Sequence, residues 1–359
     1  MALTGDRVRE MVLQQPIRVG LVGTGFVARW RSQALLGDER AELVAVAGRD
    51  GQRSYEFTQD WGGAPCDHWQ ELVERPDVDL ILISSLNHHR GAIAQAALEQ
   101  QKHVVAEYPL ALIPAQAEAL LTLAQQQQRL LHIGHIELLG GLHQAFVDYL
   151  PHLGGVSDVR YCTINPKHPA PRRWTYSSEE FGFPLIGALS RLHRLISVFG
   201  QVESVTAQAR FWPETQAQYY RACLCKAQLR FCSGVFADVV YGKGDRFLAK
   251  EHLLEARGVG GVLRLTPDAG QLDQGPHQES IRIGPRRGLF AQDTRRVLEY
   301  LCQGRPLYVD SRSSLYSLTV AEAVRLAVER DAPVHLANRR EAPRSPVGEA
   351  CRRHRGASG

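Results

Sequence analysis

The sequence contains no hydrophobic run long enough to cross a membrane. No stretch reaches the roughly 20 consecutive apolar residues that a spanning helix needs. The N-terminal residues mix acidic and basic side chains and lack the apolar core of a signal peptide. Hydrophobic residues make up 44% of the chain, which is ordinary for a globular protein. We therefore expect a cytoplasmic protein without a membrane segment.

The sequence also lacks the spacings typical of a disulfide framework or a metal centre. Its seven cysteines are scattered and odd in number, which fits a reducing compartment. Cys223, Cys225 and Cys232 lie near one another, but no second Cys-x-x-Cys and no His-x-x-x-His accompanies them. We expect these cysteines to lie in strands, and we expect no metal.

A basic face on the folded part is missing as well. The net charge is +4, but residues 337–359 carry six arginines against two glutamates, so this tail accounts for the whole excess. The tail, which we place at residues 335–359, is poor in large apolar residues, and we expect it to be disordered. We expect no nucleic-acid partner.

The most informative segment is residues 17–28. Its apolar beginning predicts a buried strand, and it ends in Gly23-Thr24-Gly25-Phe26-Val27-Ala28, the Gly-x-Gly-x-x-Ala turn of dinucleotide-binding folds. Gly23 permits the tight turn, Gly25 lets the backbone approach a pyrophosphate, and Ala28 permits close packing of helix on strand. The pyrophosphate would lie at the N-terminus of the following helix. The expected cofactor-binding residues are Gly23, Thr24, Gly25, Phe26 and Val27.

The residues after the second strand bear on which dinucleotide binds. NAD-specific folds place an acidic residue at the end of the strand predicted at 43–47, where it binds the ribose hydroxyls. Here Arg49 and Asp50 stand in that place, and Arg53 follows one turn later. Charge-assisted bonds from arginine to a 2′-phosphate would favour NADPH over NADH by roughly ten- to a hundredfold. Asp50 argues for NAD, and the arginines could instead be solvated charges at a helix start.

Strands and helices alternate through the first third of the chain. Further apolar strands are predicted at 79–84, 103–107 and 130–134, with helices at 92–100 and 115–129. This alternation indicates a doubly wound parallel sheet, in which ligands bind beyond the carboxyl ends of the strands. Asn87 and the segment Glu107-Tyr108-Pro109 are therefore expected beside a nicotinamide.

The pattern changes after Glu137, where strands alternate between apolar and polar residues. Strands are predicted at 156–164, 202–211, 221–231, 235–241, 251–257 and 262–265, and helices at 183–199, 288–301 and 310–329. Alternation of this kind is typical of an antiparallel sheet with one buried face.

The sequence thus predicts a fold of the α/β class with two domains. An N-terminal Rossmann domain with a doubly wound parallel sheet is expected at residues 16–135, after an N-terminal extension at 1–15. A C-terminal α+β domain with a mostly antiparallel sheet, which would bind the substrate, is expected at 136–334.

These features together resemble the glucose–fructose oxidoreductase/inositol dehydrogenase family. The resemblance rests on the dinucleotide turn, Asn87, a Glu-x-Pro triplet and the antiparallel C-terminal sheet. The family usually carries Glu-Lys-Pro, whereas this chain has Tyr108 in place of the lysine. The family's Asp and His on the substrate-domain helix align with Arg191 and Leu195. A sugar alcohol dehydrogenase built this way would lack its general base.

Longer segments are similar to the prokaryotic biliverdin reductases, a branch of that family. The similar segments are residues 107–112, 135–141, 173–176, 181–185, 190–194, 241–244 and 286–290. The resemblance covers about residues 16–330. It implies NADPH-dependent reduction of biliverdin IXα to bilirubin, by hydride transfer to the central methine bridge.

The resemblance implies that Arg191, Arg194 and Tyr108 act on the substrate. Arg191 and Arg194 are three residues apart and would project from one face of a helix. An arginine does not readily give up a proton, because its pKa lies above 12. We therefore expect Arg191 to polarise the tetrapyrrole, while the proton comes through water or a propionate. The arginines could instead bind carboxylates elsewhere, and Tyr108 could be a packed structural residue.

Several further residues mix cations and aromatic rings, as a flat dianion would require. The expected substrate-binding residues are Arg172, Arg173, Trp174, Tyr176 and Arg221. Asn87, Glu107, Arg49 and Arg53 are expected to bind the cofactor. His135 and Glu137 are expected to form a structural hydrogen bond, and Asp293 to pack or cap its helix.

Two alternatives to a biliverdin reductase stay open. One is an NADP-dependent sugar or dihydrodiol dehydrogenase of the parent family. The other is a sensor on the same fold that binds NADP or a bilin without catalysis. The oligomeric state does not follow from the sequence.

Overall fold

The computed structural model describes residues 13–213 and 218–336, which fall into two compact units. Unit 1 comprises residues 1–136 and 287–314, and unit 2 comprises residues 137–286 and 315–359, each within the described ranges. This division differs from the contiguous one expected, because residues 287–314 return to unit 1. Of the predicted extension at 1–15, residues 1–12 lie outside the described residues, and so do residues 337–359 of the predicted tail at 335–359.

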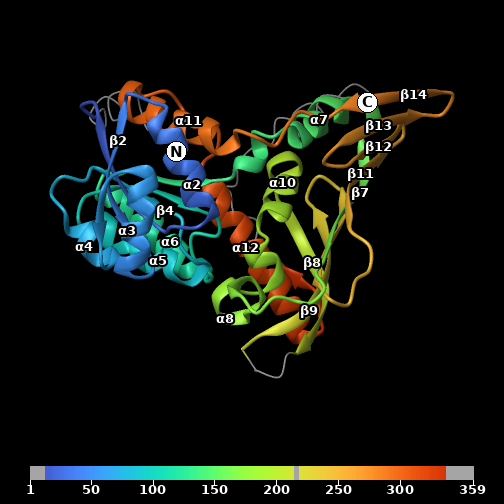
Figure 1. The fold of residues 1–359 in the computed structure, drawn as a ribbon. Coiled ribbons are helices and arrows are strands. Elements are labelled where there is room, and N and C mark those ends of the chain that lie inside the picture. Colours follow the sequence, from blue (N-terminus) through green and yellow to red (C-terminus); the bar gives the residue numbers. More distant parts are fainter. Residues whose placement is uncertain (1–12, 214–217, 337–359) are drawn as a thin grey trace. The chain divides into compact units, whose positions relative to one another are not determined.

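Unit 1 contains a six-stranded sheet with the order β3-β2-β1-β4-β5-β6 (Figure 1). All five pairs of neighbouring strands are parallel. The strands are β1 Ile17–Val22, β2 Ala41–Ala47, β3 Ala64–Cys66, β4 Leu80–Ile83, β5 His103–Glu107 and β6 Leu131–Gly134. Every residue of the central strands β4 and β5 is buried; β4 is apolar throughout, and β5 is apolar between His103 and Glu107, as expected for strands covered on both faces. The doubly wound parallel sheet is thereby confirmed.

The helices of unit 1 connect these strands. They are α2 Phe26–Leu36, α3 Gly51–Trp61, α4 Trp69–Glu74, α5 Asn87–Glu99, α6 Pro114–Gln126 and α11 Leu289–Gln303. The short strand β3 and the helix α4 were not predicted, because each is too short to show a periodic pattern. Helix α11 packs its Val297, Leu298 and Leu301 into the same apolar core as Leu21 and Leu35.

Unit 2 contains a nine-stranded sheet with the order β14-β13-β12-β11-β7-β10-β9-β8-β15 (Figure 1). Neighbouring strands are antiparallel except β7 and β10, which are parallel. The strands are β7 Val156–Pro166, β8 Val202–Pro213, β9 Tyr220–Phe231, β10 Phe236–Gly244, β11 Glu251–Gly258, β12 Gly261–Leu265, β13 Ala269–Gln274, β14 His277–Arg282 and β15 Val334–His335. The mostly antiparallel sheet is confirmed.

Three predictions for unit 2 need correction. Cys232 was expected in a strand, but β9 ends at Phe231 and Cys232 lies in the turn that follows. The helix predicted at 183–199 is two helices, α9 Pro184–Gly187 and α10 Ser190–Phe199. A Cβ at Gly187 would lie within 2.5 Å of ring atoms of Phe181, so the chain breaks there around a close contact. Residue 335 also belongs to a strand rather than to the tail, since β15 pairs with β8.

The remaining helical segments of unit 2 lie along its sheet or between its strands. They are α7 Gly141–Tyr149, η2 Leu150–Leu153, η3 Trp174–Tyr176 and α8 Ser178–Phe181, while η1 Ile136–Leu138 spans the boundary between the two units in the chain. Helix α12, Ser311–Arg330, begins in unit 1 and continues into unit 2. None of the helices within the described ranges combines the length and apolar character that a bilayer crossing demands.

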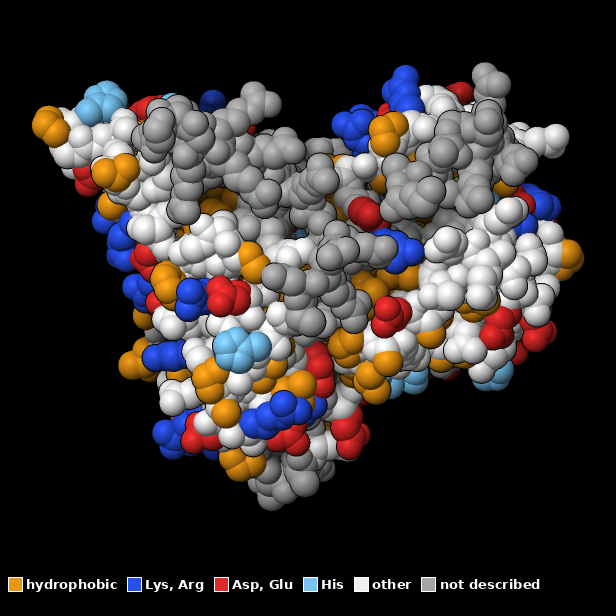
Figure 2. Space-filling model, turned by 180° about the vertical axis from the view of Figure 1, so that it is seen from behind, with side chains coloured by type: hydrophobic (Ala, Val, Ile, Leu, Met, Phe, Trp, Pro, Cys, Tyr) orange, Lys and Arg blue, Asp and Glu red, His pale blue; other side chains and the backbone are white. Residues whose placement is uncertain are grey.

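The charged side chains on the surface are of both signs. On the face seen in Figure 2, blue and red groups are interspersed among the described residues. Many form pairs, such as Arg18 with Asp79 at 2.6 Å and Arg325 with Glu322 at 2.8 Å. Such exposed pairs contribute little to stability, about 0–1 kcal/mol each.

Candidate active site

The glycine turn has the geometry that dinucleotide binding requires. Gly23 has a φ of +116°, and a Cβ there would lie 2.7 Å from the carbonyl oxygen of Ser84. Gly25 is the N-cap of α2, and no atom lies within 4 Å of the place where its Cβ would be. The backbone at the helix N-terminus is therefore open to an anion, while Ala28 is fully buried against the sheet.

The end of β2 presents two exposed guanidinium groups. Asp50 is the N-cap of α3, and its carboxylate accepts a hydrogen bond of 2.9 Å from the backbone N of Arg53. The side chains of Arg49 and Arg53 lie 3.7 and 3.9 Å from the same carboxylate and are mostly exposed. Asp50 thus has a structural role at the helix start, which weakens its value as evidence for NAD.

A buried ion-pair network includes Glu107, which is predicted to lie beside the nicotinamide. Arg31 of α2 is 1% exposed and donates to Glu107 Oε1 from Nε at 3.2 Å and from Nη2 at 2.8 Å. Its Nη1 contacts Asp293 of α11. Burial opposes the charge of Arg31, but Asp293 and Glu107 together raise its pKa. Asp293 is therefore an ion-pair partner, a role that its sequence position did not reveal.

The other oxygen of Asp293 completes this network. Its Oδ1 lies 2.8 Å from His132 Nε2 and accepts a hydrogen bond of 2.7 Å from the hydroxyl of Tyr308. Although burial raises the pKa of Asp293, Arg31 and His132 lower it well below its usual range. The network joins the helix of the glycine turn to Glu107, the first residue of Glu-Tyr-Pro.

A second buried arginine holds the Glu-Tyr-Pro turn. Arg90 of α5 donates from Nη1 to the backbone oxygen of Tyr108 at 2.6 Å and of Pro109 at 3.2 Å. Its Nε donates to the backbone oxygen of Ser85 at 3.1 Å. Burial lowers the pKa of Arg90 to about 10. Asn87, the first residue of the same helix, is also buried.

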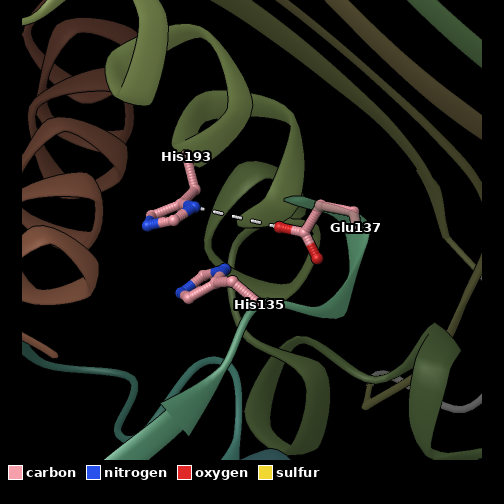
Figure 3. A group of neighbouring side chains, drawn as sticks. All are labelled: His135, Glu137 and His193. Carbon is pink, nitrogen blue, oxygen red and sulfur yellow. Dashed lines mark ion pairs between the residues drawn. The ribbon is translucent and has the colours of Figure 1, made fainter. Parts of the chain in front are cut away.

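Tyr108 itself packs on an imidazole. Its ring is stacked on that of His135, with centroids 4.9 Å apart. His135 Nε2 lies 2.8 Å from Ser314 Oγ, so the expected structural role of His135 involves serine. Glu137, in unit 2, has its Oε1 3.9 Å from Nδ1 of His193 on α10 (Figure 3).

In unit 2, helix α10 places two arginines over the rings of two tyrosines. The guanidinium carbon of Arg191 lies 5.4 Å from the ring centroid of Tyr241, and that of Arg194 lies 6.0 Å from the ring centroid of Tyr161. Tyr161 on β7 and Tyr241 on β10 face the same side of the sheet, since Tyr241 is paired with Thr163. The two arginines therefore share one face, as their spacing predicts.

The two arginines differ in burial. Arg191 is partly exposed, and its Nη1 donates to Ser190 Oγ at 2.9 Å. Arg194 is 5% exposed, and its Nε and Nη1 have no hydrogen-bond partner within the described part of the chain. Because buried donors are seldom left unpaired, Arg194 is suited to bind an acceptor group of a ligand.

Two more polar side chains lie on the same face of the sheet. Thr163 of β7 is directly opposite Tyr241 on one side and His252 of β11 on the other. The buried atoms Thr163 Oγ1 and His252 Nε2 lack partners among the residues described. Burial, with Arg191, Arg286 and Arg194 nearby, lowers the pKa of His252 to about 4, so this ring is neutral near pH 7.

The predicted substrate-binding residues all fall in unit 2. Arg172 and Arg173 are exposed, Trp174 and Tyr176 form η3, and Tyr176 is buried. Arg221 of β9 pairs with Asp245, with 2.7 Å between its Nε and the carboxylate. Its charge is thus already neutralised, which the sequence did not indicate.

Two buried charged residues, Arg31 and Lys243, were not singled out by their sequence pattern. Lys243 is buried at the end of β10 between four aromatic rings. Both residues interrupt an otherwise apolar pattern: Arg31 lies on the buried stripe of α2 with Ala28 and Leu35, and Lys243 continues the inward positions of Val239 and Tyr241. A charge at a buried position is a signal that could have identified them.

Comparisons with known proteins agree with this architecture. The model of an oxidoreductase family with an NAD-binding Rossmann fold matches residues 17–135. The model of that family's C-terminal alpha/beta domain matches residues 152–336.

Individual relatives include reductases of two kinds of substrate. One relative is the biliverdin reductase of Synechocystis sp. PCC 6803, whose crystal structure is a complex with biliverdin and NADP+. Its sequence is 46% identical to this chain, the TM-score is 0.86, and the match covers 88% of this chain and 99% of that one. It is 33% identical to dTDP-3,4-didehydro-2,6-dideoxy-α-D-glucose 3-reductase of Actinomadura kijaniata, over 86% of this chain and 95% of that one. It is 28% identical to human biliverdin reductase A over 43% of this chain and 49% of that one.

Proposed function

The chain belongs to the oxidoreductase family with an NAD-binding Rossmann fold and a C-terminal alpha/beta domain, and we propose that it reduces biliverdin IXα to bilirubin with NADPH. The observation that carries this proposal is the 46% identity, over 88% of the chain, to a biliverdin reductase crystallised with biliverdin and NADP+. The arginine pair on α10 and the Glu-Tyr-Pro turn support it, because the proton-accepting residues of a sugar dehydrogenase are replaced there.

The residues of unit 1 fit the cofactor. The open backbone at Gly25 and the N-terminus of α2 would hold the pyrophosphate, with Thr24, Phe26 and Val27 beside it. Arg49 and Arg53 would bind the 2′-phosphate, since both guanidinium groups are exposed at the end of β2. Asn87 and Glu107 would flank the nicotinamide. NADPH supplies a hydride when it is bound.

The residues of unit 2 fit a flat dianion. Arg194 offers buried donors to an acceptor, and Arg191 offers a cation beside the ring of Tyr241. Arg172, Arg173 and Trp174 add charge and aromatic surface for an extended ring system, whereas the ring of Tyr176 is buried beside Lys243. These contacts would fix the tetrapyrrole and its propionates.

Arg191 acts on the substrate by its charge rather than by its proton. A guanidinium with a pKa above 12 holds its protons, so it donates hydrogen bonds to the tetrapyrrole and stabilises the negative charge that hydride addition creates. The proton for the pyrrole nitrogen comes from water or from a propionate. Removal of one such preorganised donor typically lowers kcat by about 10²-fold.

A second candidate is reduction of a keto-sugar nucleotide. It is favoured by the 33% identity to the dTDP-sugar 3-reductase over most of both chains. Against it, Arg191 and Leu195 occupy the places where the sugar-oxidising relatives carry their Asp and His. A sensor that binds NADP or a bilin without turnover is the third possibility.

Mixing the protein with NADPH and biliverdin separates these three functions. Loss of the biliverdin band with growth of bilirubin absorbance is the expected result. Arg191→Ala should lower kcat by about 10²-fold. The matched control is Arg160→Ala, an exposed arginine of β7 that pairs with Glu251, and its rate should stay within about twofold. A spectral shift without turnover would indicate a sensor, and reduction of a dTDP-keto-sugar alone would indicate the second candidate.

A further inference from the structure

Lys243 is a buried charged residue for which the proposed reaction has no use. It lies on β10, directly opposite Cys223 of β9 and Asn165 of β7, two residues beyond Tyr241. Its side chain is on the same face as Tyr241, which Arg191 covers, because successive odd positions of a strand face one side. Only 5% of Lys243 is exposed.

Four aromatic rings surround its amine. The Nζ lies 3.6 Å from the ring centroid of Phe181, 5.0 Å from that of Tyr176, 5.4 Å from that of Tyr220 and 5.7 Å from that of Tyr241. Tyr220 and Tyr241 belong to the sheet, whereas Tyr176 and Phe181 belong to η3 and α8. The amine therefore joins two parts of unit 2 that are distant in sequence.

The same amine makes a hydrogen bond to the backbone. Its Nζ donates to the carbonyl oxygen of Thr175, which lies within η3. The ring of Phe181, which the amine contacts, also packs on Trp174, with 5.9 Å between the ring centroids. Lys243 thus contacts the segment of residues 173–181 at its backbone and at two rings, one of which belongs to Phe181, the neighbour of Trp174.

We propose that Lys243 is a positioning residue for substrate recognition, which holds residues 173–181 against the sheet so that Arg173 and Trp174 meet the substrate. This proposal rests on the proposed function for the identity of the substrate. The attachment of residues 173–181 by Lys243 is independent of the proposed function, because it is a property of the protein without substrate.

The hydrogen bond from Lys243 to Thr175 does not depend on the protonation state of the amine. Burial lowers the pKa of the amine to about 7; the nearby Cys223 raises it, and Arg173 and Arg191 lower it further. An amine donates a hydrogen bond whether it is neutral or protonated, so the contact with Thr175 persists across neutral pH.

Removal of Lys243 should leave unit 2 folded, because other contacts hold the same segment. The hydroxyl of Tyr220 donates to the carbonyl oxygen of Thr175 at 3.3 Å. Ser177 forms an isolated bridge with Tyr219 and accepts a hydrogen bond of 3.2 Å from the backbone N of Glu180, which caps α8. The segment would then be attached by fewer contacts rather than released.

The test compares Lys243→Met with Lys226→Met in the full-length protein. Methionine matches the length of lysine but has no donor, and Lys226 is an exposed residue on the other face of β9. Backbone hydrogen exchange of residues 173–181 is measured without substrate, followed by kcat and KM for biliverdin with saturating NADPH.

The expected result is faster exchange within residues 173–181 in Lys243→Met alone, with KM raised about tenfold and kcat within about twofold. Unchanged exchange would overturn the proposal, and so would faster exchange with an unchanged KM. If the unmodified protein does not reduce biliverdin, the proposed function fails, while exchange still decides whether Lys243 tethers the segment. If Lys243 were only structural, Lys243→Met would lower the melting temperature without raising KM selectively over kcat.

Discussion

The ring of Tyr108 lies parallel to the imidazole of His135, with an interplanar angle of 5° and 4.9 Å between centroids. Ser314 Oγ lies 2.8 Å from His135 Nε2 and so fixes that imidazole, while Arg90 holds the backbone of Tyr108 from the other side. The ring of Tyr108 is thus held in place before any ligand binds. The sequence leaves open whether Tyr108 is packed or contacts substrate; in the structure its ring is packed on one face and the residue is partly exposed.

Replacement of Tyr108 separates the ring from its hydroxyl. Tyr108→Phe keeps the stack on His135, and kcat/KM for biliverdin should stay within about threefold. Tyr108→Leu loses an aromatic pair worth about 0.5–1.5 kcal/mol. If that energy holds the site in its reactive geometry, kcat/KM for biliverdin should fall by about two- to tenfold. If Tyr108→Phe is as impaired as Tyr108→Leu, the hydroxyl rather than the ring is what the reaction needs.

The exposed arginines at the end of β2 should determine which cofactor is used. The double change Arg49→Ala and Arg53→Ala removes both guanidinium groups, and the preference for NADPH over NADH should fall by roughly ten- to a hundredfold. The KM values for the two cofactors give the measurement. Arg75→Ala, whose arginine pairs with Asp77 at 2.6 Å, is the control and should leave the preference unchanged. An equal preference in the double variant and the unmodified protein would refute the assignment.

The buried pairing of Arg31 should dominate the stability of unit 1. Arg31→Met leaves the carboxylates of Glu107 and Asp293 buried without their cation, which should cost about 3–5 kcal/mol in free energy of unfolding. Urea denaturation measures this loss. Arg18→Met is the matched control, because Arg18 forms a comparable pair with Asp79 at an exposed position, and it should cost less than about 1 kcal/mol. Equal losses in the two variants would contradict the role assigned to the network.

The pH dependence of stability should report on Lys243. Its pKa is lowered to about 7 by burial, with Cys223 opposing and Arg173 and Arg191 adding to the shift, while an unfolded lysine has a pKa near 10.4. Between these values the unfolded chain binds a proton that the folded chain does not, so the free energy of unfolding rises with pH.

This contribution should be absent from Lys243→Met. The unmodified protein should gain about 2–3 kcal/mol over the variant between pH 7 and pH 9, at about 1.4 kcal/mol per pH unit. Chemical denaturation at several pH values gives the comparison. If the free energy of unfolding changed with pH in the same way for both proteins, the amine of Lys243 would titrate as it does in water, which would contradict this prediction.

The parts of the fold that the sequence predicted are those with a strong local pattern. The continuous apolar run of β4 and the glycine turn before α2 each define an element without reference to distant residues. Strands β13 and β14 were missed because their sequences are mostly polar, with single buried residues such as Leu272 and Ile281. Their pairing comes from neighbouring strands, which a local pattern does not contain.

The same distinction applies to the candidate site. The spacing of Arg191 and Arg194 is local, and it predicted their common face. The partners of Arg31 lie 76 and 262 residues away, and the rings around Lys243 come from three segments: residues 173–181, β9 and β10. Such contacts exist only once the sheets have formed, so a single sequence shows the charge but not what surrounds it.

The return of residues 287–314 to unit 1 limits how the two halves of this protein can be exchanged with those of a relative. Helix α11 supplies both Asp293, the partner of Arg31, and the leucines that fill the core beside β1. A chimera joined once, near residue 136, would therefore combine one parent's guanidinium with the other parent's carboxylate. A swap that preserves the nucleotide-binding half has to carry both pieces of chain, with junctions near 136, 286 and 314.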